Sequence, residues 1–247
     1  MWDDARQLNA VALVLTAISV LLLAWGAMSW AARRPAFEFQ EIVVTAPPAR
    51  INAAHLEAVI RDELKGTFFT MNLDRGRTAL ARVPWVRRVA LRRQWPHRLE
   101  VIIEEHVPLA RWNDNALVNG QGEVFVANYK NALPRFSGPD GAAQEVTRRY
   151  REWGAQLAAL SLGIDEMRLS PRGGWYLHVA NDNGPLGIEL GRDDPAGALA
   201  RFVVIYERTI GALARAGTNV EQVDLRYRNG FAVKVPGFRE RAPRKAA

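Results

Sequence analysis

The first feature of the sequence is an uninterrupted apolar run near the N-terminus. No charged residue occurs between Arg6 and Arg33, and residues 8–32 read LNAVALVLTAISVLLLAWGAMSWAA. A helix needs about 20 apolar residues to cross a bilayer, so this run predicts a transmembrane helix preceded by a short tail of residues 1–7. Trp25 and Trp30 lie near its C-terminal end, and indole rings prefer the membrane interface.

A cleavable signal peptide is the alternative for this segment, because Ala27 and Ser29 could form a small-residue cleavage site. Such a peptide has a basic start and an apolar core of about 7–15 residues, whereas this start is acidic and the run is longer. An uncleaved anchor is therefore expected. Arg33 and Arg34 follow the span, so a count of flanking cations favours a cytoplasmic C-terminal side, but that rule is weak for long translocated domains.

Residues 35–108 have the alternating patterns of a small α+β domain. The segment 98–107 alternates Leu99, Val101 and Ile103 with polar residues, which is typical of a half-buried strand. Asn52 can cap a helix whose apolar positions recur at spacings of three and four. The predicted elements are a strand at 37–44, a helix at 52–64, a second helix containing Leu73, Arg77 and Leu80, and strands at 85–95 and 98–107. The predicted order is strand, helix, helix, strand, strand.

Residues 109–238 predict a second domain that is rich in strands. A strand pair is expected around 113–127, further strands at 165–169, 175–180 and 186–190, and helices at 142–162 and 195–216. The second helix carries a stripe of Leu199, Phe202, Val203, Tyr206, Ile210 and Leu213, and such a stripe is typical of a core-facing surface. The fold class is therefore α+β, with a mixed sheet following the first domain.

The chain ends in a predicted β-hairpin of residues 220–228 and 231–236. Asn229-Gly230 separates the two strands and suits the positive φ values of a two-residue type I′ turn. That turn would place Arg226 opposite Val233 and Tyr227 opposite Ala232. One face would then carry Val223, Leu225, Tyr227 and Ala232 towards the core, and the other Phe231, Val233 and Val235 with Asp224, Arg226 and Arg228.

No strand follows this hairpin in the sequence, so 231–235 is expected at the edge of the sheet with unpaired N–H and C=O groups. Edges invite pairing with another chain unless charge, proline or a covering segment protects them. A partner strand could add there, with Phe231 and Val233 holding its side chains and Arg226 or Arg228 binding acidic groups. Shielding of the edge by the protein's own helix or tail is the alternative, and the residues alone leave both open.

The composition argues against catalysis. The chain has no Cys, so thiolate catalysis, disulfides and Cys-containing zinc sites are excluded. The four His residues are scattered without a metal-ligand spacing, and none of the five Ser residues is followed by Lys three positions later, as a penicillin-binding transpeptidase would require. We therefore expect no enzyme activity, no cofactor and no metal.

The charge balance is basic, with 33 Lys and Arg against 26 Asp and Glu and a net charge of +7. Nucleic acid is not the expected partner, because the sequence offers neither a recognition helix nor a pattern of stacking aromatics. The basic tail 239–247 is expected to be flexible, with acidic lipids or acidic partner segments as possible contacts.

Several local patterns resemble one known family. They are Pro84-Trp85-Val86, Trp95-Pro96 with Leu99, Glu104 and Pro108, Gly187-Ile-Glu-Leu-Gly-Arg192, Arg201-Phe202-Val203 and Val223-Asp-Leu-Arg-Tyr227. With the preceding element order they resemble the FtsQ/DivIB family of bacterial cell-division proteins, in which a POTRA domain follows a single membrane span. Ala46-Pro47 departs from the glycine turn that often ends the first strand in the family.

The resemblance implies a divisome scaffold in the cell inner membrane, with a cytoplasmic N-terminus and a periplasmic C-terminal part at the septum. It implies a POTRA domain at 35–108, a C-terminal domain at 109–238, recruitment of FtsB and FtsL through the last strand, and contacts of the POTRA domain and membrane helix with other divisome proteins. The implied partner-binding residues are Arg172, Arg226, Tyr227, Asn229, Gly230, Phe231 and Val233. The alternative is a POTRA-containing component of a polypeptide export or outer-membrane assembly machine, and a membrane-tethered wall hydrolase is a third, less supported class.

Overall fold

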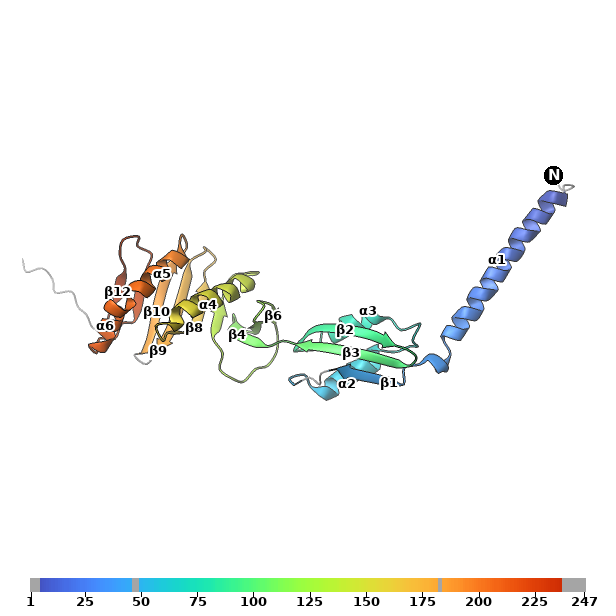
Figure 1. Cartoon of the computed structure of the whole chain (residues 1–247), viewed down its shortest axis with the longest axis horizontal. Coiled ribbons are helices and arrows are strands. Elements are labelled where there is room, and N and C mark those ends of the chain that lie inside the picture. Colours follow the sequence, from blue (N-terminus) through green and yellow to red (C-terminus); the bar gives the residue numbers. More distant parts are fainter. Residues whose placement is uncertain (1–4, 46–48, 182–183, 237–247) are drawn as a thin grey trace, which may run out of the picture. The chain divides into compact units, whose positions relative to one another are not determined.

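The computed structural model describes residues 5–45, 49–181 and 184–236 and divides the chain into two compact units, Met1–His106 and Val107–Ala247. The first unit begins with helix α1 (Ala5–Ala32). Its segment Leu8–Ala32 is long and apolar enough to cross a membrane, and its most apolar part is not buried by the rest of the protein. Figure 1 shows it as one long continuous helix at the N-terminus. This arrangement agrees with a single-pass membrane protein.

The rest of the first unit is a three-stranded sheet covered by two helices. Its elements are η1 (Pro35–Phe37), β1 (Glu41–Thr45), α2 (Ala53–Glu63), α3 (Leu73–Leu80), β2 (Val86–Gln94) and β3 (Arg98–Glu105). The sheet order is β1-β3-β2, with β1 parallel and β2 antiparallel to β3. The predicted order strand, helix, helix, strand, strand is confirmed.

Local chemistry explains these elements. The side chains of Asn52 and Asn72 accept hydrogen bonds from the N–H groups of His55 and Arg75 and cap α2 and α3. Leu99, Val101 and Ile103 alternate with partly buried residues along β3 and are themselves buried against the helices. The predicted first strand at 37–44 is only partly correct, because Pro35–Phe37 forms a 3-10 turn before β1 begins.

The second unit is a nine-stranded mixed sheet. Its strands are β4 (Pro108–Trp112), β5 (Ala116–Asn119), β6 (Val124–Phe125), β7 (Arg135–Ser137), β8 (Gly163–Leu169), β9 (Trp175–Asn181), β10 (Gly184–Gly191), β11 (Gln222–Asp224) and β12 (Ala232–Lys234). The order is β12-β11-β10-β9-β8-β7-β4-β5-β6. Its helical elements are α4 (Ala143–Ala158), α5 (Pro195–Ile205), η2 (Tyr206–Arg208) and α6 (Ile210–Arg215).

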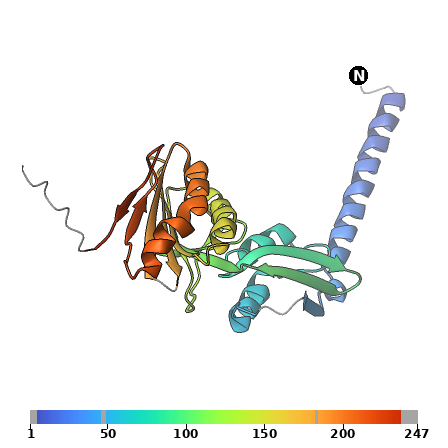
Figure 2. The same ribbon diagram turned by 60° about the vertical axis from the view of Figure 1, so that its left-hand side comes forward.

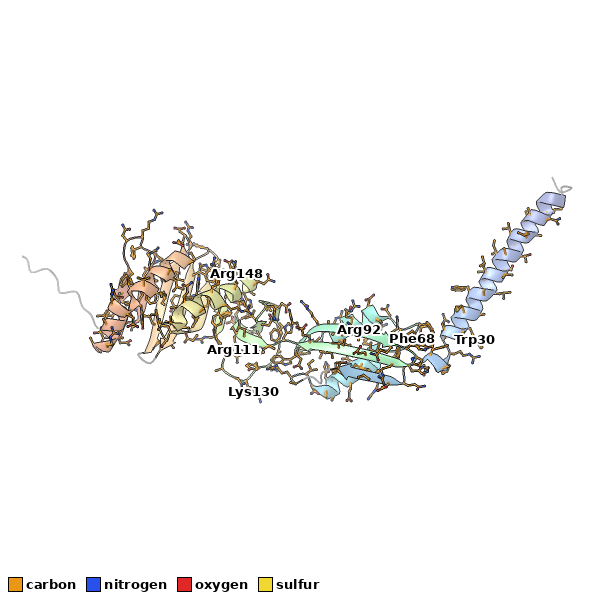
Figure 3. The ribbon with its side chains drawn as sticks, viewed as in Figure 1. Trp30, Phe68, Arg92, Arg111, Lys130 and Arg148 are labelled. Carbon is orange, nitrogen blue, oxygen red and sulfur yellow. The ribbon has the colours of Figure 1, made fainter. Side chains whose placement is uncertain are left out.

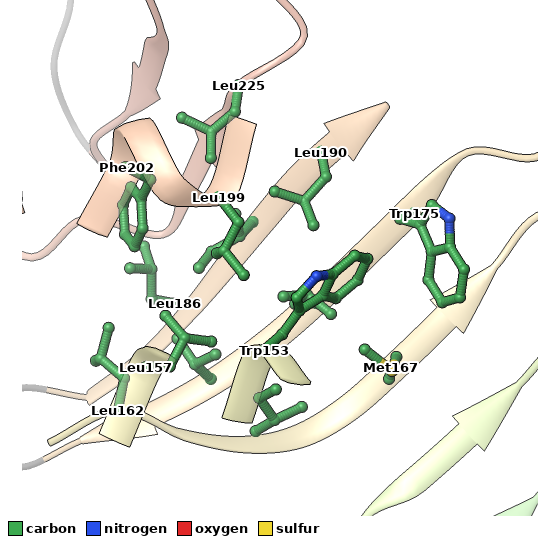
Figure 4. Packing of buried hydrophobic residues seen from close by; sticks show 14 of the residues in the cluster. Trp153, Leu157, Leu162, Met167, Trp175, Leu186, Leu190, Leu199, Phe202 and Leu225 are labelled. Atoms are coloured by element: carbon green, nitrogen blue, oxygen red, sulfur yellow. The ribbon is translucent and has the colours of Figure 1, made fainter. Parts of the chain in front are cut away.

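Helices α4 and α5 cover one face of this sheet, as Figures 1 and 2 show. The core lies between these helices and the strands: Trp153 and Leu157 of α4 and Leu199 and Phe202 of α5 are buried against sheet residues (Figure 4). The predicted stripe on residues 195–216 is therefore a core surface over most of its length. The helix itself is interrupted, because the chain passes through η2 and Thr209 before α6 begins.

The predicted hairpin register is wrong. Residues 229 and 230 lack the positive φ of a type I′ turn, and the ladder pairs Gln222 with Lys234, Val223 with Val233 and Asp224 with Ala232. The strands are joined by residues 225–231. One contribution is local: the Asp224 carboxylate accepts the Arg226 backbone N–H, an Asx turn that bends the chain directly after β11.

The register shift exchanges the predicted faces of the last strand. Phe231, Val233 and Val235 are half-buried and pack against the core, whereas Tyr227 and Ala232 are exposed. An odd shift in register moves a whole side-chain set to the other face of a sheet. Val223 and Leu225 are buried as predicted.

Some expectations concern residues outside the described part of the chain. These are the tail 239–247, the start of segment 1–7, the loop at Ala46-Pro47 and part of the turn at 181–184.

Candidate partner-docking edge

Strand β12 occupies one end of the nine-stranded sheet. Within the described residues it pairs with β11 and with no other strand. Figure 2 shows the two red strands at the border of the sheet. The predicted position of the last strand at an edge agrees with this topology.

The direction of the backbone groups on β12 follows from its neighbours. The Glu221 carbonyl accepts from Gly187 N–H at 2.9 Å and the Leu225 N–H donates to the Glu189 carbonyl at 2.8 Å, so these two backbone groups face β10. The Glu221 N–H donates to the Lys234 carbonyl at 2.9 Å, which places that carbonyl on the β11 side of β12. Because backbone groups alternate along a strand, Gln222 and Asp224 face β12 and bond with their partners Lys234 and Ala232. The N–H and C=O groups of Phe231, Val233 and Val235 therefore point to the open edge.

The loop 225–231 is held by a charged cluster at its start. The Arg226 guanidinium donates to Asp224 Oδ1 at 2.8 Å and lies 3.2 Å from a Glu189 carboxylate oxygen of β10. Its aliphatic part packs over Gly191, where an added Cβ would lie 3.0 Å from Arg226 Cγ. Arg226 thus positions the loop within its own domain, and its binding of acidic partner groups stays a prediction.

This cluster shifts two pKa values. The hydrogen bond from the Arg226 side chain lowers the pKa of Asp224, and the same bond, with the nearby Glu189 charge, raises the pKa of Arg226. Both groups remain ionised at neutral pH, so the clamp on the loop is intact there.

A pH dependence follows from the lowered Asp224 pKa. Its contribution to stability is fully present above the unfolded carboxyl pKa of about 4 and is lost as the pH falls through the lower folded value. We expect Asp224→Asn to be less stable than the wild type at pH 7, with the difference shrinking towards pH 3. Denaturant unfolding at several pH values measures this, and a difference that stays constant with pH would refute the role of the carboxylate charge.

A basic hollow of about 810 Å³ lies beside this cluster. Arg172, in the turn between β8 and β9, lines it together with Arg226 and Arg228. Arg192 and Arg201 add two further cations, and Asp193 and Asp194 are the acidic residues of the lining. The structure thus brings the predicted residues Arg172 and Arg226 into one site. Arg172 and Arg228 form no ion pair with any described residue, so their charges are open to acidic groups.

An apolar hollow of about 640 Å³ adjoins the first and lies between α5 and the loop. Phe202, Val204 and Ile205 line it from the helix, and Asn229, Gly230 and Phe231 line it from the loop. Val204 is 78% exposed. Tyr227, 57% exposed, lines a smaller hollow on the same loop.

Sequence reasoning missed the contribution of α5. The stripe on residues 195–216 predicts a core surface alone, although Val204 falls outside the part of the helix that is buried. An apolar residue on the otherwise polar face of an amphipathic helix was the signal that could have identified it. Arg201, on the same helix, lines both hollows.

The other titratable groups of the second unit offer little chemistry. His178 and Asp165 form a pair at 2.7 Å on the sheet, and the described residues hold no group of three or more side chains suited to a metal ion. The site is therefore an edge of backbone donors and acceptors flanked by an apolar and a basic hollow.

Comparison with known proteins gives family matches to both units. A model described as POTRA domain, FtsQ-type, matches residues 37–106, and one described as cell division protein FtsQ/DivIB, C-terminal, matches residues 110–226. The second match ends before β12, so the description of the last strand depends on the geometry of this chain.

Curated relatives match over nearly the whole chain. A cell division protein FtsQ of Burkholderia pseudomallei is 39% identical, with 97% of this chain and 96% of the relative covered. One of Bordetella pertussis is 35% identical, covering 94% and 92%. One of Escherichia coli is 31% identical, covering 94% of this chain and 85% of the relative.

Proposed function

Because the chain belongs to the FtsQ family of cell-division proteins, we propose that it is a non-catalytic scaffold of the divisome that recruits FtsB and FtsL through strand β12. The observation that carries this proposal is the open edge, where Phe231, Val233 and Val235 direct backbone donors and acceptors away from the sheet. The family supports interactions with division proteins, and the edge supplies a physical means for one of them.

Strand addition explains how the edge could hold a partner. An extended segment would accept and donate main-chain hydrogen bonds along β12, and side-chain pockets would supply specificity. Because the apolar side chains of β12 pack against the core, recognition of partner side chains falls to the hollows beside the strand. An apolar partner side chain suits the hollow at Val204, and acidic ones suit the arginines around Arg172 and Arg228.

The remaining predicted site residues have distinct places in this scheme. Arg226 holds the loop, Tyr227 offers an exposed ring, and Asn229 and Gly230 form the rim of the apolar hollow. Phe231 packs against the core and lines the same hollow. Phe231→Lys would therefore lower stability as well as binding, and it is a poor test of docking alone.

Charge reversal at the basic hollow tests the contribution of the arginines. We expect Arg172→Glu with Arg228→Glu to weaken binding of the FtsB–FtsL complex about tenfold, and more at low salt, because exposed charges are screened by ions. Arg148→Glu on the exposed face of α4 is the matched control and is expected to leave affinity unchanged (Figure 3). An equal loss in both variants would indicate a general charge effect.

The membrane helix sets the proposed topology. We propose that the N-terminus is cytoplasmic and that both folded units lie in the periplasm at the division septum. Protease added to spheroplasts should digest residues after 34 and leave cytoplasmic proteins intact. Protection of these residues in sealed spheroplasts, with digestion after lysis, would reverse the topology.

Depletion of the protein distinguishes the proposed role in cell division from the alternative role in polypeptide export or outer-membrane assembly. Depletion of the protein should give undivided filaments, and the wild-type gene should restore septation. An envelope-assembly defect without filaments would favour the alternative class of POTRA proteins.

A further inference from the structure

The end of the first domain that adjoins α1 carries a cluster of aromatic side chains. Phe37, Phe68, Phe69 and Trp95, here called the aromatic tip, come from three segments: the turn after α1, the loop before α3 and the turn between β2 and β3. Ring centroids are 5.2 Å apart for Phe37 and Phe69, 5.3 Å for Phe68 and Phe69, and 5.5 Å for Phe68 and Trp95. The rings form one contiguous surface.

The outer rings of this surface are not buried by the domain. Phe69 is 53% exposed and Trp95 is 66% exposed, whereas Phe37 and Phe68 beneath them are half-buried. Aromatic rings exposed side by side commonly mark a surface that contacts a partner or a membrane. The core of this domain does not account for Phe69 and Trp95, because neither belongs to it.

Hydrogen bonds connect the tip to the last turn of α1. The Thr67 hydroxyl donates to the Ala32 carbonyl at 2.7 Å, and the Phe68 N–H donates to the Phe37 carbonyl at 2.7 Å. Thr67 is 5% exposed, so the first bond is shielded from water. Figure 3 labels Trp30 of α1 and Phe68 of the tip at this end of the unit.

The length of α1 places its end at the membrane surface. The apolar segment Leu8–Ala32 has 25 residues and is about 37 Å long at 1.5 Å per residue. The hydrocarbon core is about 30 Å thick and the bilayer with headgroups about 40–45 Å, so one or both ends of this segment extend into the headgroup layer. Trp30, with the Arg34 guanidinium 3.5 Å from its ring centroid, gives the C-terminal end the composition of an interfacial anchor.

We propose that the aromatic tip contacts the bilayer that α1 crosses, with Phe69 and Trp95 lying in the headgroup layer next to Ala32. Aromatic side chains, and tryptophan above all, favour this layer because the ring is apolar and the indole N–H can still reach water. Arg33 and Arg34 are exposed beside it and can pair with lipid phosphates. The domain is thereby held against the membrane surface and does not hang from a free linker.

The test uses the full chain, which has no cysteine, so that one can be introduced alone. Gln94→Cys places a probe beside Trp95 without removing an aromatic ring. Ala54→Cys is the matched control, because position 54 lies at the opposite end of β3 from the aromatic tip. This place follows from nearby Ile51, whose N–H donates to the Glu105 carboxylate at the end of β3. Positions 94 and 54 are both exposed. Each variant is labelled with a nitrobenzoxadiazole dye and reconstituted into vesicles of phosphatidylethanolamine and phosphatidylglycerol containing a headgroup nitroxide lipid.

We expect quenching at position 94 to exceed that at position 54 at least threefold. Adding Phe69→Ser and Trp95→Ser should reduce the quenching at 94 to the level at 54, while Trp95→Tyr should preserve it. The difference should persist in neutral phosphatidylcholine, because the contact is made by the rings.

Equal quenching at the two positions would overturn the proposal. So would quenching at 94 that survives loss of both rings, since the helix alone would then explain proximity, or quenching confined to anionic vesicles. If the double variant shows altered thermal unfolding, the quenching at position 94 is compared with and without Trp95→Ser as the single change. Trp95 is 66% exposed, so its loss has little effect on folding. Binding of FtsB and FtsL is not required for any of these outcomes.

Discussion

Val233→Pro should weaken binding of the FtsB–FtsL complex about 10- to 100-fold while the second unit stays folded. The substitution removes the N–H that points to the open edge, leaving a partner carbonyl without its donor, and an unsatisfied buried polar group costs about 1–3 kcal/mol. The ladder with β11 is formed by the flanking residues Ala232 and Lys234, so proline at 233 removes no hydrogen bond of the domain. Titration of the purified full chain with the complex measures the affinity.

Val233→Thr is the control for the side chain. It keeps the backbone N–H and the branched shape, so any loss of binding should be much smaller than with proline. Circular dichroism and the unfolding midpoint establish that both variants are folded. Unchanged affinity in Val233→Pro would remove strand addition from the account, whatever other contacts the hollows make.

Trp153→Ala should cost about 3–5 kcal/mol of unfolding free energy in the second unit, the range for truncating a large buried aromatic. Trp153 is 1% exposed and lies between α4 and the sheet, with its ring centroid 5.0 Å from that of Trp175 in an edge-to-face contact (Figure 4). Since domains are stable by only about 5–15 kcal/mol, this loss removes a large part of the total. Denaturant titration followed by far-ultraviolet circular dichroism measures it.

Val204→Ala provides the contrast in the same unit. Val204 is 78% exposed, and its truncation should change the unfolding free energy by less than about 0.5 kcal/mol. A cost below about 1 kcal/mol for Trp153→Ala would contradict the placement of α4 on the sheet. A large cost for Val204→Ala would mean that the apolar hollow is a packed part of the domain and not an open surface.

The sequence predicts the periodic elements of this fold well, and the reason is burial. Leu99, Val101 and Ile103 alternate because one face of β3 packs against helices, and the apolar positions of α2 recur because that helix covers the same sheet. The prediction of a transmembrane helix at 8–32 is equally direct, because the length of this apolar run alone distinguishes it from the helices of the folded domains.

The last hairpin shows where local reasoning fails. Asn229-Gly230 has strong turn propensity, but the Asx turn made by Asp224 and the burial of Leu225 in the core are the features that accompany the shifted ladder. A turn preference is worth little against the burial of a leucine, so tertiary packing decided the register. The α5 side of the site was missed because one exposed valine gives no periodic signal.

The position of β12 at the edge of the sheet was predictable, because that prediction needed only the fact that no further strand follows it in the sequence. Arg172 is far from Arg226 in sequence, and only the pairing of β9 with β10 and of β10 with β11 brings the β8–β9 turn to the same hollow. The resemblance to the family suggested Arg172, whereas nothing in its local sequence distinguishes it from the other exposed arginines.

Amide hydrogen exchange of β12 tests the central claim most directly. In the full chain alone, the N–H groups of Phe231, Val233 and Val235 should exchange faster than those of Ala232 and Lys234, which bond to β11. Addition of the FtsB–FtsL complex should slow the first set strongly and leave the second set nearly unchanged. Unaltered exchange at residues 231, 233 and 235 in the saturated complex would contradict the account.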